Sequence, residues 1–315
     1  MTPTVISQLC RKKLLVLPTH CLRSIRPSFS SSLPSRSLSS SRTMATKSTM
    51  LQSNRLKQAF QANKGPSMGV WQMIPGSNVS RILARAGADW VMVDCEHGNI
   101  DDAAMHEAVP AIAALGVSPI VRIPDLQHWM IKRALDCGAH GILVPLIRTV
   151  EEVENIVAAA KFPPQGRRGF GSPIAMQNFD SGPTFTEYLQ QANESLLTMV
   201  QIETREALEV VEKIAPLVDV LFVGPFDLGN NIGHPIIDGK MDPELDEAIS
   251  RTLKAAHAAG KKCGIFCTSG EQANSYANAG FDMISVATDY TLLGAAMAES
   301  LATARGRDHN KVASY

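Results

Sequence analysis

The chain has 315 residues, 45% of them hydrophobic, and a formal net charge of +0 at pH 7. This length suits one domain of about 250 residues with appendages. The balanced charge gives no electrostatic reason to expect nucleic acid or an anionic membrane as a partner. No apolar run approaches the roughly 20 residues that span a bilayer, so we expect no membrane insertion.

Residues 1–50 differ in composition from the rest of the chain. They are basic and Ser-rich, and no Asp or Glu occurs before Asp89. This composition predicts a mitochondrial transit peptide and a mature protein in the matrix, or else a disordered leader without an address. Initiation at Met44 or Met50 would give a cytoplasmic form. The six scattered cysteines are interpreted as reduced thiols.

From residue 68 onward, short apolar runs alternate with helical patterns, which is typical of repeated βα units. The strands are expected at 68–71, 90–94, 119–122, 141–144, 198–203, 220–224, 262–266 and 282–286. The helices are expected at 78–86, 103–115, 127–137, 150–161, 205–215, 243–259, 271–279 and 290–302. Eight such units predict an α/β TIM (β/α)8 barrel over residues 51–303 with a C-terminal tail at 304–315. No G-x-G-x-x-G follows the first strand, so a dinucleotide site is not indicated.

The segment 162–193 is longer than a barrel connection needs. It contains Arg168 and Ser172 among several loop-forming residues. We expect it on the catalytic face as a lid or substrate loop, with a plain surface excursion as the alternative.

Charged and polar residues are concentrated where the predicted strands end. Strand 90–94 runs into Asp94-Cys95-Glu96-His97, and strand 119–122 ends at Arg122. Strand 198–203 ends in Gln201 and Glu203, and strand 220–224 runs into Asp227. Barrel enzymes carry their chemistry at this face, and two neighbouring carboxylates can hold a hard divalent cation. The alternative is that each acid only caps the next helix. No lysine ends a strand, which disfavours a Schiff-base mechanism.

Four segments, taken in this order, resemble the HpcH/HpaI family of class II pyruvate aldolases. They are 93–98 (VDCEHG), 121–122 (VR), 201–207 (QIETREA) and 222–228 (FVGPFDL). The likeness extends over about residues 68–293. It implies a TIM-barrel aldolase that depends on a divalent metal, Mg²⁺ or Mn²⁺, with Co²⁺ or Zn²⁺ also open.

The resemblance also implies roles for residues that bind the metal and the keto acid. Glu203 and Asp227 match the metal-binding carboxylates, and Gln201 lies beside the bound keto acid. Arg122 matches the arginine that contacts the ketone oxygen. The backbone at Phe226 and Asp227 would receive the keto-acid carboxylate.

The remaining implied roles concern the proton and the assembly. His97 matches the catalytic base, Asp136 falls at the position of the aspartate that pairs with it, and Asp94 matches a further acid behind the site. Family members are homo-oligomers whose last helix packs on a neighbouring subunit, so a hexamer is expected.

The resulting prediction is a metal-dependent aldolase that cleaves or forms 2-keto-4-hydroxy acids through a pyruvate enolate, with a 2-keto acid and an aldehyde as substrates. Oxaloacetate decarboxylation, or the enolate capture of the related macrophomate synthase, is an alternative on the same site. Acyl-CoA lyase chemistry would need a nucleotide-binding surface that the sequence does not reveal. A barrel without catalysis, acting as a scaffold, is the alternative from another class.

Overall fold

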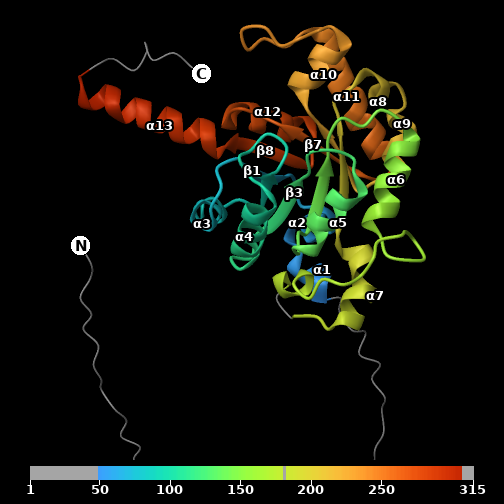
Figure 1. Cartoon of the computed structure of the whole chain (residues 1–315). Helices are drawn as coiled ribbons and strands as arrows, with labels where there is room; N and C mark the ends of the chain where they lie inside the picture. The colour runs from blue at the N-terminus through green and yellow to red at the C-terminus, as the bar shows by residue number, and fades with distance from the viewer. Residues whose placement is uncertain (1–48, 180–181, 307–315) are drawn as a thin grey trace, which may run out of the picture. The chain divides into compact units, whose positions relative to one another are not determined.

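The computed structural model describes residues 49–179 and 182–306. Eight parallel strands close into a barrel in chain order, because β8 pairs with β1 (Figure 1). The predicted TIM barrel is confirmed. The strands are β1 (Ser67–Gln72), β2 (Trp90–Asp94), β3 (Ser118–Arg122), β4 (Gly141–Val144), β5 (Leu197–Ile202), β6 (Val220–Val223), β7 (Lys262–Phe266) and β8 (Met283–Thr288).

Most helices lie within a few residues of their predicted positions. They are α3 (Ser77–Arg85), α4 (Asp102–Ala113), α5 (His128–Asp136), α6 (Val150–Ala160), α11 (Pro243–Ala258), α12 (Gly270–Ala279) and α13 (Asp289–Ala304). The helix expected at 205–215 is instead broken into α8 (Arg205–Glu209), α9 (Val211–Ile214) and the 3-10 turn η2 (Ala215–Leu217). Five elements were not predicted: α1 (Thr49–Ser53), α2 (Arg55–Ala62), η1 (Ala175–Asn178), α7 (Phe185–Ser195) and α10 (Pro225–Ile232).

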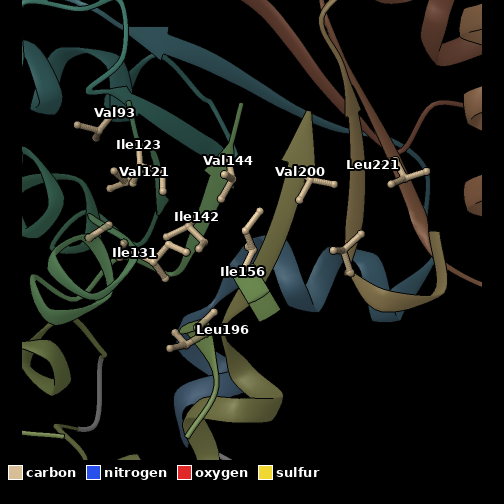
Figure 2. Packing of buried hydrophobic residues seen from close by; sticks show 14 of the residues in the cluster. Val93, Val121, Ile123, Ile131, Ile142, Val144, Ile156, Leu196, Val200 and Leu221 are labelled. Carbon is tan, nitrogen blue, oxygen red and sulfur yellow. The ribbon is translucent and has the colours of Figure 1, made fainter. Parts of the chain in front are cut away.

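The strands bury both faces, and successive side chains enter two different cores. Trp90 and Met92 of β2 point into the barrel, where they pack with residues such as Phe222 and Met199. The alternate residues point outward against the helices. Figure 2 shows this outer layer, in which side chains from β2 to β6 meet residues of α5 and α6, among them Val93, Val121, Ile142, Ile131 and Ile156.

Helix α2 closes the N-terminal end of the barrel. Leu56 is fully buried in the inner core, and its amide donates to Ser118 Oγ at 3.1 Å. The side chain of Asn54 donates to the carbonyl oxygens of His140 and Ser195 at 2.8 and 2.7 Å. The catalytic face is therefore at the opposite end of the barrel, where the strands end.

The described residues of the segment 162–193, which are 162–179 and 182–193, lie at the N-terminal end of the barrel. The segment follows helix α6 and precedes β5. In a TIM barrel each helix returns the chain to the N-terminal end, where the next strand begins. Its helix α7 packs against α1, and Phe162, Phe179 and Tyr188 form an aromatic cluster. The expectation of a lid on this chain's own catalytic face is therefore wrong, because the segment follows a helix and not a strand.

The predicted leader lies almost entirely outside the described residues, so the transit peptide stays a prediction. Four cysteines, Cys95, Cys137, Cys263 and Cys267, are free thiols. Among the described residues, no helix has the length and apolar character needed to cross a membrane.

Candidate active site

A cavity of about 200 Å³ opens at the C-terminal end of the barrel. Five of the predicted site residues line it: His97, Arg122, Gln201, Phe226 and Asp227. Its other lining residues are Trp71, Met73, Gly224, Pro225 and Phe266. No lysine occurs among these lining residues.

Asp94 and Arg122 form the buried floor of the site. Arg122 donates from Nε to Oδ1 of Asp94 at 2.9 Å and from Nη2 to Oδ2 at 2.6 Å. Asp94 also accepts from Trp71 Nε1 at 2.9 Å. Burial opposes ionisation of Asp94, but the hydrogen bonds and charge of Arg122 outweigh burial and hold its pKa below the ordinary value. Both groups are therefore charged, and Arg122 is fixed in place.

The Glu203 carboxylate is buried and held at both oxygens. Oε1 accepts from the backbone amide of Leu146 at 2.8 Å, and Oε2 accepts from Gln201 Nε2 at 2.7 Å. Burial, with the negative charges of Asp227 and Glu96, raises the pKa of Glu203 to about 7. A divalent cation beside this carboxylate would offset both effects.

Glu96 is a site residue that the sequence analysis did not single out. Its Oε2 lies 3.0 Å from Arg122 Nη1 as an ion pair without hydrogen-bond alignment, and its Oε1 lies 3.7 Å from His97 Nε2. Burial raises the pKa of Glu96, with opposition from the charge of Arg122. The signal was present, since Glu96 sits between two candidates in the same strand-end motif.

Gly224 and helix α10 form one wall of the site. A Cβ at Gly224 would lie 2.5 Å from Glu203 Oε2 and 3.2 Å from Gln201 Nε2. Glycine is therefore required for the close approach of these side chains. Pro225 is the first residue of α10, and Asp227 is exposed in its first turn. The amides of Phe226 and Asp227 precede the first hydrogen bond of the helix, which Leu228 donates to Gly224, so they can donate to an anion.

Asp136 does not join the cavity of its own chain. It is the last residue of α5, five residues before β4 begins, whereas His97 follows the end of β2. The two residues thus lie at opposite ends of the barrel. Asp136 accepts from the buried Arg168 at 2.8 Å, and its carbonyl oxygen accepts from Ser172 Oγ at 2.6 Å. The structure therefore does not bring Asp136 to His97 of the same chain, and the predicted pair stays a prediction.

The residues of the cavity fit a hard divalent cation. Glu203 and Asp227 come from neighbouring strand ends and supply carboxylate oxygens, the ligand type that Mg²⁺ and Mn²⁺ prefer. The open cavity leaves room for oxygen atoms of a substrate or water to complete the coordination. The buried negative charge of Glu203 is otherwise opposed by Asp227 and Glu96.

A second group of ligand-type side chains lies elsewhere among the described residues. Ligand atoms of His234, Asp242 and Glu244 all lie within 4.8 Å of one another. Asp242 is the N-cap of α11, accepts from the amide of Glu244 at 3.0 Å and pairs with His234 at 3.3 Å. Helix capping accounts for this group without a metal.

Comparison with known proteins identifies the family. The family model of HpcH/HpaI aldolase/citrate lyase matches residues 68–296. A hydroxypyruvate/pyruvate aldolase of Chromohalobacter salexigens is 36% identical over 241 residues, covering 76% of this chain and 93% of that protein. A 4-hydroxy-2-oxo-heptane-1,7-dioate aldolase of Salmonella dublin is 35% identical over 259 residues, covering 82% and 96%.

The solved structures agree. The crystal structure of macrophomate synthase superposes with a TM-score of 0.72 at 30% identity, covering 81% of this chain and 89% of that chain. The match of the family model runs from the second residue of β1 past the end of β8 and includes every residue that lines the cavity. This chain belongs to the HpcH/HpaI aldolase/citrate lyase family.

Proposed function

We propose that the chain is a divalent-metal-dependent aldolase that cleaves or forms 2-keto-4-hydroxy acids, with pyruvate as the keto product. Its family and its aldolase-named relatives make it a carbon–carbon lyase. The observation that carries the finer proposal is the cavity in which Arg122, Gln201 and Asp227 meet beside the buried Glu203.

Arg122 and helix α10 would hold the keto acid. The guanidinium of Arg122 is fixed by Asp94 and faces the cavity, where it would stabilise the negative charge that develops on the enolate oxygen. The amides of Phe226 and Asp227 at the start of α10 would donate hydrogen bonds to the substrate carboxylate. Both contacts use groups whose positions are set before substrate arrives.

Glu203 and Asp227 would bind Mg²⁺ or Mn²⁺. When bound, such a cation supplies Lewis-acid polarisation of the keto-acid oxygens. Gln201 holds the Oε2 side of Glu203 and lines the cavity, so it would orient both the ligand and the substrate.

His97 would move the proton of the aldol hydroxyl. Its side chain is 62% exposed and lines the cavity, with Glu96 as its neighbour. In cleavage, His97 takes the hydroxyl proton as the carbon–carbon bond breaks, the aldehyde leaves and the remaining enolate is protonated to pyruvate.

A homo-oligomer is part of this proposal, with a hexamer as the expected form. Helix α13 extends away from the barrel (Figure 1), and it carries a stripe of apolar side chains that are more than half exposed: Tyr290, Leu293, Met297 and Leu301. Their spacing places them on one helical face, which suits packing on a neighbouring subunit. The predicted dyad can then be made only if His97 pairs with Asp136 of another subunit.

A second candidate is decarboxylation of oxaloacetate, with or without capture of the enolate by another electrophile. The likeness to macrophomate synthase favours keeping it. This reaction requires no base for an aldol hydroxyl, so His97 would be dispensable. A scaffold without catalysis is disfavoured, since the residues for cation, substrate and proton are all present. We further propose the mitochondrial matrix as the location, on the composition of residues 1–50.

The test is pyruvate release from a panel of 4-hydroxy-2-keto acids and oxaloacetate, with Mg²⁺ or Mn²⁺ and again with EDTA. Wild type is compared with Glu203→Ala. We expect metal-dependent release from the hydroxy-keto acids that falls at least about 100-fold in the variant. Release from oxaloacetate alone would support the second candidate, and equal activity in EDTA would contradict the metal-dependent mechanism.

A further inference from the structure

Leu146 has a backbone conformation that is rare for its residue type. Its φ is 52°, in the left-handed region, and it is one of three non-glycine residues with positive φ among those described. A γ-branched side chain gains nothing from this conformation, in contrast to Asn, whose short polar side chain is compatible with it. Such strain persists only where the surrounding structure imposes it, and it gathers at functional sites.

The conformation of Leu146 directs its amide at the candidate metal ligand. Its N–H donates to Glu203 Oε1 at 2.8 Å. The next residue is fixed to the same strand end, because Thr204 Oγ1 donates to the carbonyl of the fully buried Ile147 at 2.8 Å. Two hydrogen bonds thus join the end of β4 to the end of β5. One is donated by the Leu146 amide, and the other is accepted by the carbonyl of the next residue, Ile147.

This arrangement fixes the position of Oε2, the second carboxylate oxygen of Glu203. With Oε1 held by the Leu146 amide, Oε2 lies next to Gly224 and Gln201, both of which line the cavity. Rotation of the carboxylate would break the bond to the Leu146 amide and leave the buried Oε1 of Glu203 without this donor, which is costly.

We propose that Leu146 is a positioning residue whose strained backbone, and not its side chain, fixes the Glu203 carboxylate for cation binding. The inference rests on the proposed role of Glu203 as a metal ligand. It identifies the β4 end as part of the metal site, although no side chain from that strand end carries a charge.

A different role for Leu146 has to be distinguished. Its side chain is 38% exposed at the catalytic end of the barrel, so it could contact substrate directly. Substrate contact depends on the size and apolarity of the side chain. Positioning depends only on how readily the residue adopts positive φ. If Leu146 contacts substrate, Ile should replace it better than Gly or Asn. If Leu146 positions Glu203, Gly and Asn should replace it better than Ile.

The experiment measures Mn²⁺ affinity of the metal-free, full-length protein by electron paramagnetic resonance. Leu146→Gly and Leu146→Asn tolerate positive φ, whereas Leu146→Ile keeps the size and apolarity but is β-branched and resists it. We expect Gly and Asn to bind Mn²⁺ within about threefold of wild type and Ile to bind it about 10- to 100-fold more weakly. Leu146→Val serves as a smaller β-branched variant if Ile fails to fold.

Two further variants separate the explanations. Leu189→Ile is the matched control, because Leu189 is 39% exposed on α7 at the other end of the barrel, and it should leave Mn²⁺ binding unchanged. Glu203→Gln should abolish it. Wild-type affinity in Leu146→Ile, or losses in Gly and Asn as large as in Ile, would overturn the inference alone. Unchanged Mn²⁺ binding in Glu203→Gln would overturn the proposed metal site and the inference with it.

Discussion

Asp94 binds Arg122 through two hydrogen bonds, of 2.9 and 2.6 Å, at the buried floor of the catalytic cavity. The same carboxylate accepts from the Trp71 indole and from the amides of Glu96 and His97, at 3.1 and 3.2 Å. One buried acid therefore orders the arginine, an aromatic wall and the turn that carries the candidate base. Asp94 was predicted to lie behind the site, and these contacts give it a specific role: it fixes the groups that contact the substrate.

Asp94→Asn should reduce both activity and stability. The variant removes the carboxylate that holds Arg122 by two hydrogen bonds and leaves Glu96, 3.0 Å from Nη1, as the remaining anionic partner. Breaking a buried ion pair costs about 3–5 kcal/mol, and the contact with Glu96 makes this an upper limit for the loss. Displacement of Arg122 should also lower kcat about 10- to 100-fold. Urea unfolding and steady-state pyruvate release measure the two effects.

The control for this variant is Asp102→Asn, which removes the partner of Arg133 in an exposed pair on the helices. Exposed pairs contribute about 0–1 kcal/mol, and this one lies away from the cavity. A loss in Asp94→Asn no larger than in the control would contradict the role assigned to Asp94.

The stability of the metal-free protein should fall as pH rises from about 4.5 to about 7. Burial raises the pKa of Glu203 from its ordinary value of 4.5 to about 7. Between these values the folded state retains a proton that the unfolded state has released, so the free energy of unfolding decreases with pH. The contribution is at most about 3 kcal/mol. Saturating Mg²⁺ should reverse the trend, because the cation binds the ionised carboxylate.

Urea unfolding of wild type and Glu203→Gln across this pH range checks the prediction. The glutamine variant has no proton to release at this position, so its stability should decline less than that of wild type. Parallel curves for the two proteins would show that Glu203 titrates normally.

His97→Ala should separate the two reactions that the cavity could support. Cleavage of a 4-hydroxy-2-keto acid requires removal of the hydroxyl proton, and loss of a general base costs about 10²- to 10⁴-fold. Oxaloacetate decarboxylation has no such proton, so the variant should retain it within a few-fold. Equal losses in both assays would place His97 in substrate binding and not in proton transfer.

The sequence predicted the barrel and most of the cavity because both follow from local rules. Each strand is a short apolar run, and the residue that ends it faces the catalytic end, which located Arg122, Gln201 and Asp227. Trp71 and Phe266 lie near the ends of their strands and also line the cavity. An apolar residue at a strand end resembles ordinary core, so its residue type does not mark it as part of a site.

Other features depend on contacts that the sequence does not display. The amide of Leu146 reaches Glu203 through a backbone angle, and no residue type signals it. The described residues of the segment 162–193 follow helix α6, which runs back to the N-terminal end of the barrel, so they lie opposite the catalytic face on which a lid was expected. Asp136 was predicted from its match to a family position. Such a match does not show that Asp136 and His97 of one chain lie at opposite ends of the barrel.

Leu293→Asp should dissociate the proposed oligomer. Leu293 belongs to the exposed stripe of α13, and burying a carboxylate in an apolar contact between subunits is unfavourable. Light scattering after size-exclusion chromatography should show a smaller mass than wild type. Ile82→Asp is the control, since Ile82 is an apolar residue on α3 that is more exposed than Leu293, 69% against 51%. The same mass for both variants would argue against α13 as the contact.

Mixed oligomers should recover activity if the His97–Asp136 pair forms between subunits. Each variant, His97→Ala or Asp136→Asn, is expected to lose aldol cleavage when it is assayed by itself. In a 1:1 mixture that is dissociated and reassembled, a site that takes His97 from one subunit and Asp136 from another is intact with a probability of about one quarter. Aldol cleavage in the mixture should therefore rise to about one quarter of wild type. Because the barrel keeps these residues at opposite ends of one chain, activity that stays at the level of the single variants would remove Asp136 from the catalytic mechanism.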